Sequence, residues 1–142
     1  MFKLSQAKEL GEAVVEITFD GKATGATVTL ASPDHSRSRE AIAEFDRRRR
    51  QYKKTRPGRE IGDDSDEMRK ATIDSLVART LGWQGFANDD GTALAFNEEN
   101  VREAYEKYGW LRAQLLRALA DDELFMPRSA SRSSTSPAST SD

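Results

Sequence analysis

The stretch that decides the fold is residues 76–125, LVARTLGWQGFANDDGTALAFNEENVREAYEKYGWLRAQLLRALADDELF. It holds both tryptophans of the 142-residue chain, each directly after a glycine, in the pairs Gly82-Trp83 and Gly109-Trp110. Aromatic side chains bury the largest area per residue, so they mark where a core or an interface is built. We interpret the stretch as the end of a helix, a tight loop, a short extended piece at 94–96, and then two helices.

Helical signals are clear in the second half of this stretch. Asn97 is a favourable N-cap, and Glu98 and Glu99 place negative charge in the first turn of the helix that follows. Gly109 interrupts the helical pattern, and a last helix begins after it. The side chains expected to face the core are Val101, Ala104, Tyr105 and Tyr108 in the first helix, and Leu111, Leu115, Ala118 and Leu119 in the second.

A further helix is predicted upstream of the tryptophans. Its acidic start lies at residues 64–67, where negative charge suits the positive end of the helix dipole, and Gly82 is its predicted C-terminal stop. Helical spacing predicts that its buried side is formed by Met68, Ile73, Leu76, Val77 and Leu81.

Two strands are predicted near the N-terminus. Residues 14–19 and 27–30 are rich in β-branched and aromatic side chains, and residues 20–25 between them contain two glycines that permit the positive φ of a turn. A lone hairpin is marginal in water, so this one must pack on helices or pair with another chain. Alternation places Val15, Ile17 and Phe19 on one face, and likewise Val28 and Leu30.

The next segment predicts a strongly basic helix, from a cap at Asp34 or Ser36 to about Lys54. Residues 37–59 include ten basic and three acidic side chains, a local formal charge of +7. Pro57-Gly58 should end the helix, and an acidic patch follows at 60–67. The apolar stripe of this helix is predicted as Ile42, Phe45, Arg49 and Tyr52.

Together these segments predict one α+β domain over residues 1–126, mainly helical with an N-terminal β-hairpin. Residues 127–142 contain seven serines and no large apolar side chain, so a disordered tail is expected there. The net charge of -2 argues against a generally basic nucleic-acid coat. Because the chain has no cysteine, no long apolar run and no secretory signal, we expect a soluble cytoplasmic protein.

No motif predicts catalysis, a cofactor or a metal site. Placing Gly91 at the sixth position of a calcium loop puts Phe86 at the first and Asn97 at the twelfth, where acidic ligands are required. Residues 88–91 are therefore interpreted as an Asx-type turn. His35 is the sole histidine and lies in a polar turn, without a predicted partner for a catalytic triad. We do not expect an enzyme.

Two groups of residues are candidates for binding a partner. One is aromatic, a type more often found in cores, although two tryptophans beside glycines in so small a domain also suit a partner groove. The other is a basic patch, which has the charge to neutralise several phosphates or to form a solvated face opposite acidic residues. The aromatic group comprises Trp83, Phe86, Phe96, Tyr105 and Trp110, and the basic patch comprises Arg47, Arg48, Arg49, Arg50, Lys53 and Lys54.

The order of motifs over residues 76–126 resembles the small tail assembly chaperones of long-tailed bacteriophages. The matching features are Gly82-Trp83 after a helix, Asp90-Gly91 before the extended Leu94-Ala95-Phe96-Asn97, and Tyr108-Gly109-Trp110 before a terminal helix that ends at Phe125. The strand sequences VEITF and TVTLASPD are similar to the N-terminal part of such proteins. The arginine run and the serine-rich tail are not part of the pattern.

The resemblance implies a non-catalytic protein of the host cytoplasm. It would coat and solubilise the tape measure protein before the tail tube polymerises around it, and would be absent from the finished tail. The implied partners are the tape measure protein and also the tail tube protein, and a homo-oligomer is compatible with the role. Neither nucleic acid nor a membrane is implied.

Two alternatives stay open. The first is a nucleic-acid-binding accessory protein that uses the basic helix over 47–59, although no helix-turn-helix, zinc finger or RNA-binding strand motif accompanies it. The second is a structural tail or connector protein that remains in the virion. A very long, helix-rich reading frame directly downstream would favour the chaperone.

Overall fold

The computed structural model describes residues 1, 3–4, 10–55, 66–121 and 123–126. Three strands and four helices follow in the order β1 (Glu12–Phe19), β2 (Lys22–Ala31), α1 (Ser36–Thr55), α2 (Asp66–Arg79), β3 (Thr80–Gln84), α3 (Glu98–Lys107) and α4 (Gly109–Leu119). The predicted α+β class, with an N-terminal hairpin and mainly helical structure after it, is confirmed. The predicted break at Pro57-Gly58, the helix start at 64–65 and the tail at 127–142 lie outside the described residues.

The sheet is antiparallel in the order β1-β2-β3. Its hairpin turns on Asp20 and Gly21, which both have positive φ, as two-residue turns between right-twisted strands require. β2 therefore begins at Lys22, earlier than the predicted turn over 20–25 allowed. The register shifts between Glu16 and Thr18, where the hydroxyl of Thr24 donates to the carbonyl of Ile17.

The third strand corrects the prediction of a helix that continues to a stop at Gly82. α2 ends at Arg79, and residues 80–84 pair with β2, with Trp83 opposite Val28 and Gly82 opposite Thr29. Residues 80–84 form hydrogen bonds with the edge of β2 that β1 leaves open. The stabilisation from this pairing outweighs the local preference for a helix. Leu81 is consequently only partly buried. Residues 94–96 form no strand, and the only bridge in the loop joins Ala87 to Ala93.

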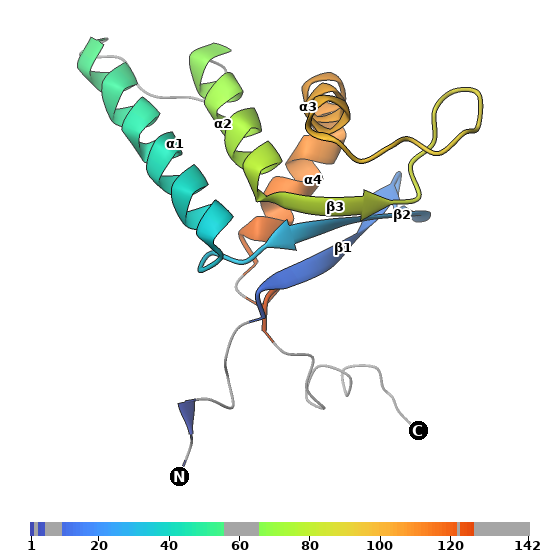
Figure 1. Ribbon diagram of the computed structural model, residues 1–142, viewed down its shortest axis with the longest axis horizontal. Coiled ribbons are helices and arrows are strands. Elements are labelled where there is room, and N and C mark those ends of the chain that lie inside the picture. Colours follow the sequence, from blue (N-terminus) through green and yellow to red (C-terminus); the bar gives the residue numbers. More distant parts are fainter. Residues whose placement is uncertain (2, 5–9, 56–65, 122, 127–142) are drawn as a thin grey trace.

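One face of the sheet carries the core. Its buried side chains alternate along the strands and pack against α2, α3 and α4, whereas Val14 on the opposite face is half exposed. Figure 1 shows α1 beside α2, with α3 on the other side of α2. The core is formed by Ile17, Val28, Leu30 and Trp83 from the sheet, and by Ile73, Leu76, Val77, Val101, Tyr105, Leu111 and Leu115 from the helices.

Helix α1 packs on α2 through a stripe that differs from the predicted one. Ser38, Ala41 and Tyr52 are buried and Phe45 is half buried, whereas Ile42 and Arg49 are exposed. Phe45 and Tyr52 are therefore confirmed, whereas Ala41 and Arg48 take the places predicted for Ile42 and Arg49. Tyr52 and Phe45 form a second small cluster with Met68 and Ala71 of α2.

A buried arginine joins the start of α1 to the ends of α2 and β2. The Arg79 guanidinium donates to the Ser38 hydroxyl at 3.0 Å and to the Ala31 carbonyl at 3.1 Å, and burial lowers its pKa. His35 caps the first turn of α1, because its Nδ1 accepts from the backbone N–H of Arg37 at 3.1 Å. The sole histidine therefore has a structural contact at a helix end.

The last two helices begin as predicted, but the second ends early. The Asn97 side chain accepts from the Asn100 N–H at 2.8 Å, which confirms the N-cap. α4 ends at Leu119, so the expectation of a helix to Phe125 is wrong. The chain turns instead, Phe125 is buried in the core, and its carbonyl accepts from the N–H of Leu10 at 2.7 Å. Burial of an aromatic ring outweighs another helical turn here.

Candidate partner-binding groove

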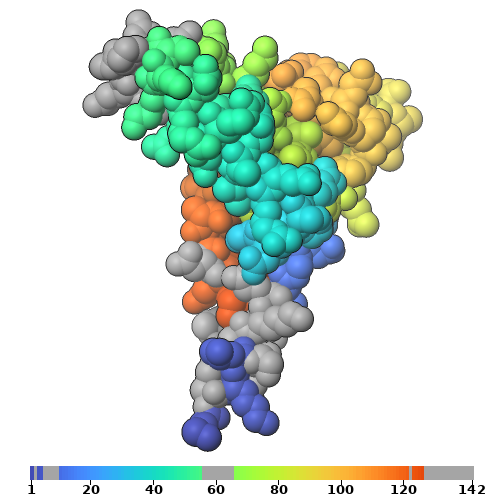
Figure 2. Space-filling view, turned by 60° about the vertical axis from the view of Figure 1, so that its left-hand side comes forward, coloured from blue at the N-terminus to red at the C-terminus, as the bar shows by residue number. Residues whose placement is uncertain are grey.

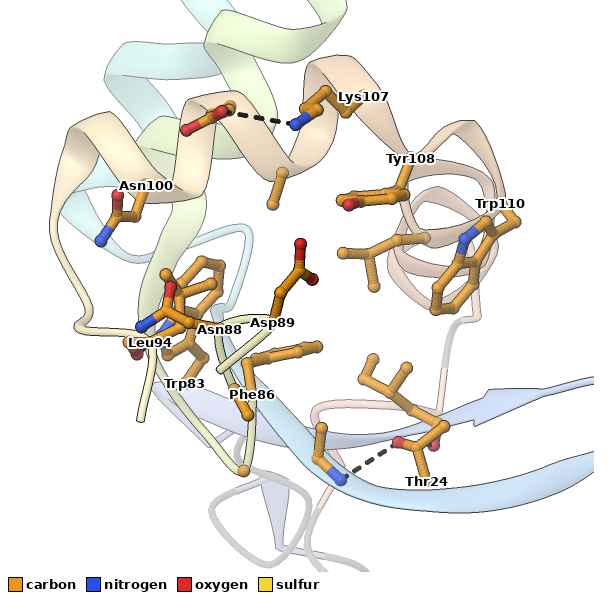
Figure 3. A pocket seen from close by; sticks show the side chains of 17 residues that line it. Thr24, Trp83, Phe86, Asn88, Asp89, Leu94, Asn100, Lys107, Tyr108 and Trp110 are labelled. Atoms are coloured by element: carbon orange, nitrogen blue, oxygen red, sulfur yellow. Dashed lines mark hydrogen bonds and ion pairs between the residues drawn. The ribbon is translucent and has the colours of Figure 1, made fainter. Parts of the chain in front are cut away.

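An open groove of about 420 Å³ lies between the loop at 85–97 and the corner where α3 meets α4. Ile17, Ala26 and Leu111 line its floor. Figure 3 shows Trp83 and Phe86 on the side of the loop, and Tyr108 and Trp110 on the side of the helices. We call this feature the aromatic groove.

The loop wall depends on a close approach of two backbone segments at Gly85. Its φ is 85°, and a Cβ there would lie 2.6 Å from the carbonyl oxygen of Gly25. Immediately after this turn Phe86 packs on Trp83, with ring centroids 4.9 Å apart. The indole N–H of Trp83 donates to the Leu94 carbonyl at 3.1 Å and so fixes the returning part of the loop.

The tip of the loop is a compact turn. The N–H of Thr92 donates to the Asp90 carboxylate at 3.0 Å and its hydroxyl does so at 2.6 Å, while Gly91 has a φ of 90°. The hydrogen bonds from Thr92 hold the pKa of Asp90 below its usual range. The predicted Asx-type turn is confirmed.

The helical wall depends on the break between α3 and α4. Tyr108 lies between the two helices, so Tyr108 and Trp110 project from the corner with 47% and 40% of their surfaces exposed. Trp110 packs edge-on against Phe19 of β1, with centroids 4.9 Å apart. The Gln114 amide both donates to and accepts from the backbone of Thr18, at 2.9 and 2.8 Å, so α4 is held on the edge of β1.

Three of the five predicted aromatic residues line the groove, namely Trp83, Phe86 and Trp110. Phe96 does not line it; its ring packs edge-on against Trp83, with ring centroids 5.8 Å apart. Tyr105 is fully buried, so in this structure it belongs to the core and is no contact residue. Its hydroxyl shares a 2.8 Å hydrogen bond with Thr80, and burial raises its pKa to about 12.

Among the lining residues that the sequence does not mark for partner binding, Tyr108 and Asp89 are the two that the binding argument needs. Tyr108 was assigned to the buried side of a helix, although its place directly before Gly109-Trp110 marks it as a corner residue. Asp89 was read only as part of a turn. The structure places it in the lining, and Figure 3 shows its carboxylate directed into the groove, on the side of Tyr108.

The groove end of the molecule is acidic. Residues 85–107 carry six acidic and two basic side chains, a local formal charge of -4. On the rim, Glu103 pairs with Lys107 at 3.6 Å. Asp89 accepts no hydrogen bond and forms no ion pair within the described part of the chain.

The basic patch lies apart from the groove, on α1. Arg47 pairs with Glu44 at 2.6 Å, and Arg48 pairs with Asp74 of α2 at 2.5 Å. The other four members are exposed and pair with no acidic side chain among the residues described here, namely Arg49, Arg50, Lys53 and Lys54. In Figure 2, α1 forms a continuous green-to-cyan ridge, separate from the yellow-to-orange surface of the loop and α3.

Asp74 links the two regions. Its carboxylate accepts from Arg48 of α1 and also from Arg102 of α3. Partial burial acts to raise the pKa of Asp74, but the hydrogen bonds and charges of the two arginines outweigh it and hold this pKa below the usual range. The ionised carboxylate is therefore the form that connects α1, α2 and α3.

Neither a metal centre nor a membrane span is found in the described ranges. No three or more of their histidine, aspartate and glutamate side chains are grouped so as to hold a metal ion. No helix there is both long and apolar enough to cross a membrane.

Comparison of the chain with protein-family models, curated proteins and solved structures found no match.

Proposed function

We propose that this protein is a non-catalytic phage tail assembly chaperone. It binds and solubilises the tape measure protein in the host cytoplasm until the tail tube protein assembles around it. One observation carries the proposal: the separate motif segments that resemble this family, around Trp83, Leu94 and Trp110, all line one open groove. A core role alone accounts for Trp83, but it does not explain why Tyr108 and Trp110 project beside a concave surface.

The groove suits an extended helical partner. Its volume of about 420 Å³ has room for a few side chains and not for a whole helix, so the partner must lay side chains into it from outside. A tape measure protein is long and helical, with apolar faces that need cover before assembly. Many copies that each bind weakly along one filament give high avidity and still permit displacement.

The test is a pull-down of the co-expressed tape measure protein, the product of the long downstream reading frame, by the full chain and its variants. Trp110→Ser should weaken binding about tenfold, because partly exposed aromatic residues at grooves are typical hot spots. The matched control is Leu116→Ser, on the same helix, 38% exposed and outside the groove. Circular dichroism of both variants checks that the fold is kept.

Salt separates this proposal from nucleic-acid binding by α1. Apolar contacts should persist at about half-molar salt, where the Debye length is only a few ångströms. Phosphate contacts should weaken by roughly 0.9 log units per log unit of salt for each phosphate neutralised. If the complex dissolves at modest salt, or if both serine variants bind equally well, the proposal is wrong.

Two other functions remain as alternatives. Arg49, Arg50, Lys53 and Lys54 are exposed and have no acidic partner among the described residues, which favours a nucleic-acid-binding accessory protein. A structural tail or connector protein would stay in the virion, so its presence in purified particles would favour that alternative. Self-association of the chaperone is compatible with all three functions.

A further inference from the structure

We infer that the aromatic groove selects a partner segment in which apolar side chains flank a lysine or arginine. The inference rests on the proposed function, because it takes the groove as the docking site. It adds the chemistry of the segment that docks there: a basic amphipathic helix.

The first argument is the position of Asp89. Its carboxylate is directed into a groove that four aromatic side chains help to line (Figure 3), and it forms no ion pair with a described residue, since Lys107 of the lining pairs with Glu103. A bound apolar segment would remove water from this carboxylate, and desolvating an unpaired charge is costly. A lysine or arginine on the partner would instead give it a charge-assisted hydrogen bond. An acidic or fully apolar partner would leave the cost uncompensated.

The second argument is the aromatic lining itself. Tyr108 and Trp110 stand on the wall that faces the loop carrying Asp89, and both are well exposed. Aromatic faces attract ammonium and guanidinium groups by cation–π interactions. Their ring carbons also accept the apolar stem of lysine or arginine, whose charged head then remains near the rim. The same wall therefore suits both parts of a basic side chain.

The third argument is the separation of charge within the molecule. The groove end carries a local charge of -4 over residues 85–107, while α1 carries eight basic and three acidic residues. An acidic partner would be repelled from the groove and attracted to α1. Long-range attraction therefore guides a basic segment to the groove.

The experiment uses two synthetic amphipathic helical peptides with the same leucines. One carries lysine at its polar positions and the other carries glutamate. Both tryptophans of the full chain line the groove, so their emission reports binding directly. We expect the lysine peptide to bind at least about tenfold more tightly than the glutamate peptide.

Three variants locate the effect. Asp89→Asn should weaken binding of the lysine peptide about threefold to fivefold, as expected for a partly exposed ion pair. Asp89→Lys should reduce or reverse the preference for lysine over glutamate. Asp46→Asn is the matched control: it makes the same charge change on exposed α1, away from the groove, and should leave binding unchanged.

The outcomes distinguish this inference from the proposed function. If both peptides bind equally well, or if Asp46→Asn matches Asp89→Asn, the inference is overturned. If Trp110→Ser abolishes capture of the tape measure protein while Asp89→Lys leaves it intact, the proposed function stands and the inference falls. If the lysine preference depends on Asp89 but the tape measure protein binds independently of Trp110, the inference stands and the proposed function falls.

Discussion

The aromatic groove and the basic face of α1 are built in opposite ways. The groove is concave, acidic and assembled from segments distant in sequence, such as those of Ile17 and Trp110. The exposed face of α1 is convex and basic, and it comes from one continuous helix. Binding in the groove should depend on burial and shape and resist salt, whereas binding on α1 should depend on charge and be lost in salt.

This difference also predicts how the two regions respond to mutation. A residue of the groove wall supports both the fold and the binding surface, so changes there should lower stability as well as affinity. An exposed charge on α1 supports neither core nor helix end, so its loss should affect only what binds there. The predictions below test this asymmetry, from the largest expected effect to the smallest.

The largest effect is expected from Gly85→Ala. A Cβ at Gly85 would lie 2.6 Å from the carbonyl oxygen of Gly25, and the φ of 85° is strained for alanine. The backbone of β2 or of the loop must therefore shift. We expect the free energy of unfolding to fall by about 3 kcal/mol, with loss of peptide binding in the groove. Chemical denaturation and tryptophan emission measure the two effects.

The control is Gly82→Ala in the neighbouring strand. No atom lies within 4 Å of a Cβ built at Gly82, and its φ is not in the left-handed region. Its stability should change by less than about 0.5 kcal/mol. If the two alanine variants are equally stable, the loop wall is not built on the backbone approach at Gly85, and the comparison loses its structural basis.

The sequence predicts the elements that depend on local patterns and misses those that depend on partners. The hairpin, the Asn97 cap and the turn at Asp90 follow from side chains that bond within a few residues of themselves. The local pattern predicts a helix end at residues 80–84, because only pairing with β2 makes them a strand. It predicts a helix up to Phe125 for the same reason: the core that buries this ring is formed by distant residues.

The groove was predictable in its residue types and not in its geometry. The two Gly-Trp pairs mark Trp83 and Trp110 as candidates, and both line the groove, as does Phe86 of the loop. Helical spacing alone does not distinguish Tyr105, which faces the core, from Tyr108, which faces the groove three residues later; the local difference is that Tyr108 directly precedes Gly109. The end of α3 at Lys107 sets this difference, and it depends on how α4 docks on β1.

An intermediate effect is expected from Asp74→Asn, which breaks the link between the two regions. The Asp74 side chain and its two arginines are each about one-third exposed, so solvent weakens their attraction. After this discount we expect a loss of about 1 kcal/mol in the free energy of unfolding near neutral pH. The exposed Arg47–Glu44 pair on α1 offers a matched control. Glu44→Gln removes the acidic partner of Arg47 and should have no measurable effect on the free energy of unfolding.

The pH dependence of this loss has a definite sign. Because the pKa of Asp74 is lowered in the folded state, the ionised carboxylate stabilises the fold above the ordinary aspartate pKa of about 3.9. That stability is lost as the pH falls through the lower, folded-state value. The difference between wild type and Asp74→Asn should therefore shrink below about pH 4. A difference that grows on acidification would contradict the assigned pairing.

The smallest effect on the groove is expected from the double variant Arg49→Gln, Arg50→Gln. Both side chains are exposed and pair with no described residue, so their neutralisation removes no contact of the fold. The thermal midpoint should not shift measurably. Affinity for the lysine peptide should change by less than about twofold, because the charges on α1 are screened within about 8 Å at physiological salt. If the wild type binds duplex DNA, the slope of its log binding constant against log salt should become less steep by roughly 0.9 for each phosphate contact removed.

This double variant can break the comparison in one measurement. Suppose that it releases the tape measure protein as completely as Trp110→Ser does, with circular dichroism unchanged. The docking surface would then be α1, the acidic groove would be a feature of the core, and the asymmetry between burial and charge would be reversed. Retention of the tape measure protein at about half-molar salt by the same variant would exclude that reversal, because apolar burial then carries the affinity without the arginines.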